Sequence, residues 1–510
     1  MSIKGINNTE LLQLLAKGWP PEQAGIATEF AARWQFCLRS SGKIEAPEQN
    51  ALRFNLHLNG LRLHGAENVA CLAIGGSGEN ANNIGVLVKN FWYKTNSTDR
   101  LVFVLACSDD AYEQAVAALP QVRCLRLRPE QILSVLQSCE PLSRLKYLLR
   151  EQYSPHQLLP YNITMPVKEN MFFGRENELD RLINEPSNSF AIVGAGRLGK
   201  TSLALEFHRR LLRENDSRAT RKFHIDFFDC IEQTSDGVAR FLAKEIDPSK
   251  RSSEMTVHDL AFFLRFQANK LGGPVEMFLD EVDRVCHLQA FDILTMSARR
   301  GICRFVMCGR AMLLRILMTE NSPLNKRVEM IRLLPLDEGA AGKLILEPME
   351  DLGFDIINQE KLLQQVFHWT GRLPHLLQFY GTRLVNLALA SGAKVIVPEL
   401  VDKVRSAFET VQLFAEQLEK LSDATTRIMA EHLLTDGRRH FTLPGVQEIG
   451  RQRGINLNNA QTLEICNDLV ISNVLMWHED AYYIANQSLV HYARKMRFLD
   501  NQPKNAHLPF

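Results

Sequence analysis

The sequence lacks the features that mark membrane-spanning, secreted and metal-clustered proteins. No apolar run is long enough to cross a bilayer, and residues 1–18 contain no apolar signal-peptide core. The 10 cysteines are scattered without any C-x-x-C pair, which disfavours a zinc site or a disulfide framework. The formal net charge is only +1, so the chain as a whole attracts neither nucleic acid nor a membrane surface. These absences predict a cytoplasmic protein with reduced thiols and no membrane association.

What the sequence does contain is a glycine-rich loop between an apolar strand and a helix. Residues 190–193 form the predicted strand, and a helix is predicted from Thr201 to Leu211. Between them the chain spells G-x-x-x-x-G-K-T, a pattern whose backbone N–H groups surround phosphate oxygens. In this pattern the lysine reaches the β- and γ-phosphates and the threonine hydroxyl holds Mg²⁺. The predicted nucleotide-binding residues are Gly194, Ala195, Gly196, Arg197, Leu198, Gly199, Lys200, Thr201 and Ser202.

The same glycines also fit a second pattern. Gly194, Gly196 and Gly199 spell G-x-G-x-x-G, the dinucleotide fingerprint, and acids follow in the next predicted strand at residues 223–229. A second phosphate-site element favours the first interpretation. The apolar strand that begins at Pro274 ends in Asp280-Glu281, where Asp280 organises the Mg²⁺ shell and Glu281 polarises the attacking water. The two elements together predict ATP and Mg²⁺ as ligands, with Thr201 and Asp280 at the metal.

A third landmark precedes the loop. Phe172 to Leu179 reads F-F-G-R-E-N-E-L, and its acidic residues open a predicted helix, as the helix dipole favours. This segment, together with the two phosphate elements, resembles the AAA+/STAND group of ATPases. Within that group it is most similar to the archaeal-ATPase type and the origin-recognition-like initiators. The resemblance implies that Arg175 lies beside the nucleotide.

The resemblance implies three further site residues. Arg310, at the tip of a predicted strand over 304–310, takes the sensor position that detects the γ-phosphate. Arg327 is either an arginine finger that acts across a subunit interface or a surface charge. Pro374, in the segment T-G-R-L-P-H-L-L-Q, contacts the adenine side of the nucleotide from the first turn of a helix. Lys200, Asp280, Glu281, Arg310 and Arg327 are therefore the predicted catalytic residues.

The expected fold class is α/β, with a P-loop core on a parallel sheet. A chain of 510 residues is long enough for about two to four domains, each with its own core. We predict an N-terminal α/β domain at 1–150, a Pro-containing linker at 151–170, the P-loop ATPase core at 171–336, a helical lid at 337–415, a winged helix at 416–500 and a tail at 501–510.

The predicted winged helix raises the question of DNA. Its third helix, over residues 458–469, carries two acids and no Lys or Arg, whereas phosphate contacts usually dominate DNA affinity. Binding to DNA and packing against the ATPase core or a partner both remain open.

The N-terminal domain loosely resembles restriction-endonuclease-like domains. Those domains need an Asp and then Glu/Gln-x-Lys to bind the metal that activates water. Here Leu87 stands two residues before Lys89, and the preceding segment offers only Glu67 and Glu79. The metal ligands are mostly absent, so a regulatory or protein-binding domain is favoured over an active nuclease.

These observations predict an ATP-binding and ATP-hydrolysing molecular switch that acts on DNA or in a defence- or replication-like complex and can form homo-oligomers. Two alternatives stay open. One is a protein-binding scaffold whose nucleotide site is mainly structural, and the other is a metal-dependent nuclease that the ATPase regulates.

Overall fold

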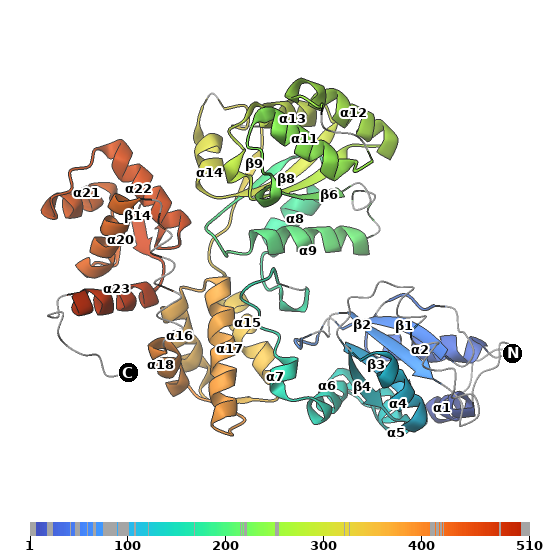
Figure 1. The fold of residues 1–510 in the computed structure, drawn as a ribbon. Helices are drawn as coiled ribbons and strands as arrows, with labels where there is room; N and C mark the ends of the chain where they lie inside the picture. Colours follow the sequence, from blue (N-terminus) through green and yellow to red (C-terminus); the bar gives the residue numbers. More distant parts are fainter. Residues whose placement is uncertain are drawn as a thin grey trace.

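The computed structural model describes most of the chain in four groups of elements (Figure 1). The described residues are 7–17, 24–40, 42–45, 51–58, 60–64, 68–74, 89, 101–106, 109–120, 122–167, 169–214, 216, 218, 222–249, 254–320, 322–325, 327–407, 414, 418, 421, 423–478 and 481–500. Within these residues, every helix is too short or too polar to traverse a bilayer.

The N-terminal unit is built on a four-stranded sheet in the order β1-β2-β3-β4. Strand β1 is antiparallel to β2, and the remaining neighbours are parallel. The alternating apolar residues Leu52, Phe54 and Leu56 of β1 are fully buried, as their period of two predicts. The elements are α1 (Asn8–Lys17), α2 (Ala24–Cys37), β1 (Ala51–His57), β2 (Asn68–Ile74), β3 (Leu101–Ala106), α4 (Asp109–Ala118), β4 (Arg123–Leu127), α5 (Pro129–Leu136) and α6 (Pro141–Gln152).

The residues on which the nuclease hypothesis depends are mostly beyond this description. Glu67, Glu79 and Leu87 lie outside the described residues. The sequence also predicts a strand over 84–91, and of this range only Lys89 is described. That the N-terminal unit lacks most ligands of a nuclease metal site therefore stays a prediction.

The central unit is a three-layer α/β arrangement around a parallel five-stranded sheet in the order β6-β7-β8-β5-β9. Alternate residues of β5 point to opposite faces: Phe190 and Ile192 join the core beneath α8 and α9, and Ala191 and Val193 join the core beneath α11, α12 and α13. The elements are α8 (Glu176–Asn184), β5 (Phe190–Val193), α9 (Lys200–Arg213), β6 (Lys222–Asp226), α11 (Ser235–Ile246), α12 (Leu260–Leu271), β7 (Val275–Asp280), α13 (Gln289–Arg299), β8 (Cys303–Gly309), α14 (Ala311–Met318) and β9 (Glu329–Arg332).

The lid is helical, and its core is continuous with that of the N-terminal unit. Its elements are α15 (Glu338–Asp351), α16 (Gln359–Thr370), α17 (Pro374–Ala390) and α18 (Glu399–Ser406), with the parallel pair β10 (Asp355–Ile356) and β11 (Val395–Ile396). The Tyr161 hydroxyl donates to the Ile345 carbonyl at 2.7 Å, and Lys146 forms an ion pair with the buried Asp351. The N-terminal unit is thus attached to the lid helices, and the domain boundaries stay predictions.

The predicted linker is less extended than its prolines suggest. Helix α6 continues to Gln152, and α7 (Pro155–Leu158) adds one turn inside the stretch expected to be a loop. Proline at the first helical position supplies a suitable φ, and Ser154 and Gln157 form a capping box. Local capping therefore overrides the loop interpretation.

The C-terminal unit comprises residues 423–500. Its elements are α20 (Ala424–Asp436), β12 (His440–Phe441), α21 (Leu443–Gln452), α22 (Asn459–Ile471), β13 (Leu475–His478), β14 (Ala481–Ile484) and α23 (Gln487–Asp500). The sequence predicts helices over 423–434, 444–453 and 458–469 and a strand pair over 473–478 and 481–485. The three helices and the β13–β14 pair match these segments, whereas β12 and α23 were not expected. The strands form an antiparallel sheet in the order β12-β14-β13. The predicted wing turn at 479–480 lies outside the described residues.

Candidate nucleotide site

The glycine-rich loop connects the carboxyl end of β5 to the start of α9, as the sequence predicts. Gly199 has φ +92, a left-handed conformation that glycine adopts without steric cost. The Lys200 ammonium group donates to the Gly194 carbonyl at 3.0 Å and to the Ala195 carbonyl at 2.9 Å. Burial lowers the pKa of Lys200 because the charged form is desolvated. The lysine therefore folds back across the loop, with its charge at the centre of the candidate phosphate site.

Strand β7 brings Asp280 to the start of α9. The Thr201 hydroxyl donates to Asp280 Oδ2 at 2.6 Å, and the Glu281 N–H donates to Asp280 Oδ1 at 2.9 Å. Asp280 is buried, and this burial raises its pKa, although both hydrogen bonds oppose the shift. The two oxygen-bearing residues predicted to hold Mg²⁺ are therefore in direct contact.

Glu281 and Arg310 meet at the same edge of the sheet. The Arg310 guanidinium donates to Glu281 Oε1 at 2.8 Å. It also lies beside the loop, because a Cβ added to Gly196 would stand 3.6 Å from Arg310 Nη1. Parallel strands β7, β8 and β5 end at one edge, which is why residues far apart in sequence converge here.

Asp283 is a site residue that the sequence reasoning missed. Its carboxylate accepts from the N–H groups of Met312 at 2.9 Å and Leu313 at 3.3 Å, and also from Arg310 N–H. These bonds cap the first turn of α14 and fix the backbone of Arg310. The only sequence signal was an acid three residues after Asp280, because its partners lie 27 to 30 residues further along the chain.

Arg175 and Pro374 lie together on the other side of the loop. With Phe172, Leu198 and Gly199 they line a cavity of about 40 Å³. The Arg175 guanidinium donates to the Leu334 carbonyl and to Glu178, the latter at 3.2 Å, and its burial lowers the pKa. The neighbouring Ser202 hydroxyl accepts from Val167 N–H at 3.1 Å. Arg175, predicted to lie beside the nucleotide, and Pro374, predicted to contact its adenine side, are thus adjacent. Arg175 and Ser202 are, however, engaged by protein groups.

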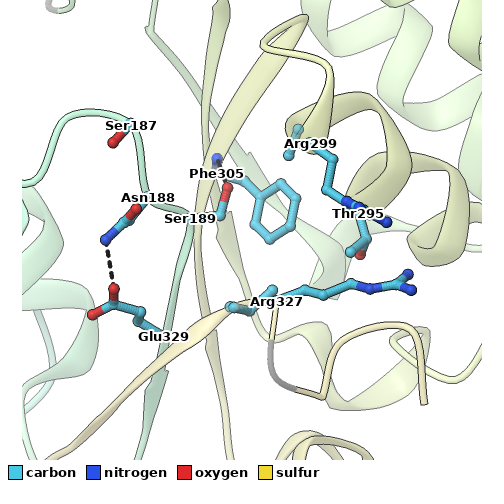
Figure 2. Close-up of a pocket in the computed structure, with 10 residues that line it drawn as sticks. Ser187, Asn188, Ser189, Thr295, Arg299, Phe305, Arg327 and Glu329 are labelled. Carbon is cyan, nitrogen blue, oxygen red and sulfur yellow. Dashed lines mark hydrogen bonds between the residues drawn. The ribbon is translucent and has the colours of Figure 1, made fainter. Parts of the chain in front are cut away.

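Arg327 is remote from its own phosphate loop. It precedes β9, whose first residue Glu329 pairs with Phe190 at the amino end of β5, whereas the loop follows the carboxyl end. Figure 2 shows Arg327 and Arg299 in an open pocket of about 450 Å³ at this opposite edge. A function for Arg327 across a subunit interface stays a prediction.

A contact that the sequence did not predict joins the loop to the C-terminal unit. Gly196 N–H donates to the Ile471 carbonyl at 3.3 Å, and the Asn473 side-chain amide donates to the Gly196 carbonyl at 2.7 Å. No local sequence signal identifies this pair, because Asn473 follows Gly196 by 277 residues.

Comparison with known proteins relates the chain to P-loop ATPases through its fold. No protein-family model matches the sequence, and no curated protein matches it. The Walker-type ATPase PABY2304 of Pyrococcus abyssi is similar with a TM-score of 0.51 and 14% identity, over 66% of this chain and 99% of that one. At this identity the likeness shows the fold alone: this chain has the α/β, parallel-sheet fold of a P-loop ATPase.

Two further solved structures are similar at lower scores. The ORC2 protein of Aeropyrum pernix, solved with ADPNP and ADP, has a TM-score of 0.42 and 14% identity over 64% of this chain and 94% of that one. The RuvB Holliday junction branch migration motor of Thermotoga maritima has a TM-score of 0.36 and 12% identity over 67% of this chain and 99% of that one. Their scores are too low to support conclusions about this chain.

Proposed function

We propose that this protein is an ATP-binding and ATP-hydrolysing molecular switch of the AAA+/STAND type. The observation that carries the proposal is the 2.6 Å contact between Thr201 and Asp280, which lies where the glycine-rich loop enters α9 and beside Lys200, whose side chain crosses the loop. A hydroxyl and a carboxylate at this point are the groups that a P-loop site uses toward Mg²⁺ and the terminal phosphates.

Thr201 and Asp280 would hold the Mg²⁺ ion. Both supply oxygen ligands, which this hard cation prefers, and it usually completes its shell with water and substrate phosphate. Among the described residues, no group of three or more His, Cys, Asp or Glu side chains is placed to hold a metal. This donor set fits an ion that is bound together with the nucleotide. The Mg²⁺ would neutralise charge on the phosphates when bound.

Glu281 is the proposed base, or orienting group, for the attacking water. Its carboxylate accepts a hydrogen bond from the Arg310 guanidinium at 2.8 Å. A γ-phosphate that attracts the guanidinium would therefore change the position of Arg310 relative to Glu281. Arg310 is thereby proposed to report the state of the nucleotide to Glu281. Lys200 would stabilise charge on the β- and γ-phosphates.

We further propose that the C-terminal unit is a winged helix whose third helix serves intramolecular packing before any contact with DNA. Glu464 and Asp468 of α22 lie 2.9 and 3.5 Å from Arg315 of the central unit. The acidic side chains of this face, which already contact Arg315, would repel a phosphate backbone. Action on DNA, the formation of homo-oligomers and a protein partner of the N-terminal unit remain parts of the proposal.

Two variants test the nucleotide proposal. Lys200→Ala removes the phosphate-binding charge and is expected to abolish ATP binding in calorimetry. Glu281→Gln keeps the shape of the side chain and should bind ATP but hydrolyse it about 10²–10⁴-fold more slowly, the usual contribution of a general base. ATP turnover is measured with and without DNA, and the subunit mass in each nucleotide state.

The outcomes separate the alternatives. Parental turnover in Glu281→Gln would refute its assigned function. Tight ATP binding without turnover by the parental protein would favour the scaffold. DNA cleavage that requires Mg²⁺ would favour the regulated nuclease, and turnover stimulated by DNA would support the switch.

A further inference from the structure

The C-terminal unit holds the phosphate loop at both polar backbone atoms of one residue. Gly196 donates its N–H to the Ile471 carbonyl at 3.3 Å and accepts from the Asn473 amide at 2.7 Å. Ile471 is the last residue of α22 and Asn473 lies in the turn before β13, so residues 471–473 are named here the docking turn. A P-loop binds phosphate by directing its backbone N–H groups toward the oxygens. Here one of these groups is already engaged by protein.

The shape of the docking turn is built into its own sequence. Asn473 N–H donates to the Val470 carbonyl at 3.2 Å, and Val474 N–H donates to the Leu469 carbonyl at 2.9 Å, which closes the end of α22. Asn473 is buried and has φ +55, a left-handed conformation that asparagine tolerates better than most residues. The turn therefore presents the Ile471 carbonyl and the Asn473 amide as a preformed pair.

Flanking contacts align the docking turn with the loop. Arg315 of α14 forms ion pairs with Glu464 and Asp468 of α22, and the Arg332 guanidinium lies 5.0 Å from the centre of the Trp477 ring. Figure 1 shows α14 on the side of the central unit that faces α22. Helix α14 begins directly after Arg310, the residue that contacts Glu281. The docked surface is thus linked to the proposed catalytic carboxylate.

The docked arrangement leaves little room beside the loop. The cavity bounded by Val193, Gly194, Ala195 and Leu198 on one side and by the docking turn and Trp477 on the other has a volume of about 50 Å³. Sites for small molecules usually enclose about 300–1,000 Å³. A nucleotide that filled this space would have to displace the docking turn.

We propose that the docking turn is a positioning element of the phosphate loop that competes with ATP, so that ATP binding releases the C-terminal unit and uncovers the acidic face of α22. This inference rests on the nucleotide site of the proposed function. Because linkage is reciprocal, docking weakens ATP binding by the same factor by which ATP weakens docking. A variant that docks less strongly should therefore bind ATP more tightly.

The first test removes the Asn473 amide without disturbing the turn. Asn473→Gly keeps the left-handed backbone, and the loss of one hydrogen bond is expected to raise the affinity for ATP with Mg²⁺ about two- to tenfold in calorimetry. Hydrogen exchange at the N–H groups of residues 470–475 should become faster. Asn358→Gly is the matched control, because Asn358 also has a left-handed φ, +51, but lies in the lid. Unchanged or weaker ATP binding by Asn473→Gly would overturn the inference.

The second test exchanges charges across the docked surface. Arg315→Glu and Glu464→Arg should each raise the ATP affinity, and the double variant should return it toward the parental value. Glu448→Arg, whose partner Arg451 lies on the same helix at 3.0 Å, controls for the change in charge. Independent effects of the two substitutions would contradict docking through this pair.

These measurements separate the two proposals. Failure of the parental protein to bind ATP removes the proposed function and this inference together. ATP binding that Asn473→Gly and the charge exchange leave unaltered removes only the inference.

Discussion

The two sheets of this chain have similar buried strands but different strand ends. In the N-terminal sheet, β2, β3 and β4 end at Ile74, Ala106 and Leu127, which are all buried and apolar. In the central sheet, β6 and β7 end at Asp226 and Asp280, and Arg310 directly follows β8. Parallel sheets place ligands beyond the carboxyl ends of their strands. The difference is therefore one of residue type at the described strand ends: they are apolar in the N-terminal sheet, whereas in the central sheet they carry polar residues of the candidate site.

The largest expected effect tests how the central sheet is anchored at its opposite edge. Arg304 of β8 is buried, contacts the rings of Phe190 and Phe207, and donates to the carbonyls of Asn188 at 2.6 Å and Leu182 at 2.9 Å. Arg304 also forms an ion pair with the buried Glu276 at 3.7 Å. Arg304→Ala removes this ion pair and the donor to both carbonyls, so we expect a loss of about 3–5 kcal/mol in the free energy of unfolding. Urea denaturation measures it.

A matched surface variant sharpens this result. Arg299→Ala changes an exposed arginine on α13 and is expected to stay within about 0.5 kcal/mol of the parental protein. If the two substitutions lowered the free energy of unfolding equally, Arg304 would not anchor the amino edge of the central sheet.

An intermediate effect on stability and ATP turnover is expected from Asp283, which positions Arg310 at the carboxyl edge of the central sheet. Asp283→Ala removes the cap of α14 and frees the Arg310 backbone, which should cost about 0.5–2 kcal/mol of stability and lower kcat about tenfold with little change in KM. Asp283→Asn retains an acceptor oxygen and should restore part of the rate. Steady-state ATP turnover checks both variants.

The control for this prediction is a helix cap elsewhere. Asp423 caps α20 by accepting from Thr426 N–H at 2.9 Å. Asp423→Ala should lower stability similarly and leave kcat unchanged. If Asp283→Ala changed stability alone, Asp283 would be a structural cap without a positioning function.

The smallest expected effect concerns the stability cost of a carboxylate at a strand end. Burial raises the folded-state pKa of Asp280, so folding favours its protonated form. This contribution to stability is present at low pH and is lost as the pH rises through the folded-state pKa. Asp280→Asn removes that loss and should increase stability at about pH 7 by about 1 kcal/mol, with a gain that shrinks toward about pH 4.

Thermal unfolding across this pH range measures the difference. Substitution of the apolar Ile74 at the corresponding end of β2 by Val provides the comparison, since no titration is involved and its effect should not depend on pH. A stability gain of Asp280→Asn that stayed constant with pH would contradict the assignment to a buried carboxylate.

Most secondary elements and the position of the glycine-rich loop followed from local sequence patterns. Apolar alternation identified β1, the apolar runs identified β5, β7 and β8, and the order of Gly194 to Thr201 identified the loop, since each signal is contained in a few neighbouring residues. The cap by Asp283 and the one-turn helix α7 were missed. The first depends on partners distant in sequence, and the second on a capping box that outweighed the prolines.

The sequence by itself determined a glycine-rich loop between a strand and a helix and its acidic partner strand, because backbone geometry and residue chemistry are local there. Only the tertiary structure decided that the N-terminal unit shares its core with the lid and that Asn473 reaches Gly196. Such contacts arise from packing between surfaces that are far apart along the chain. The sequence around a single asparagine does not indicate which distant carbonyl its amide will bind.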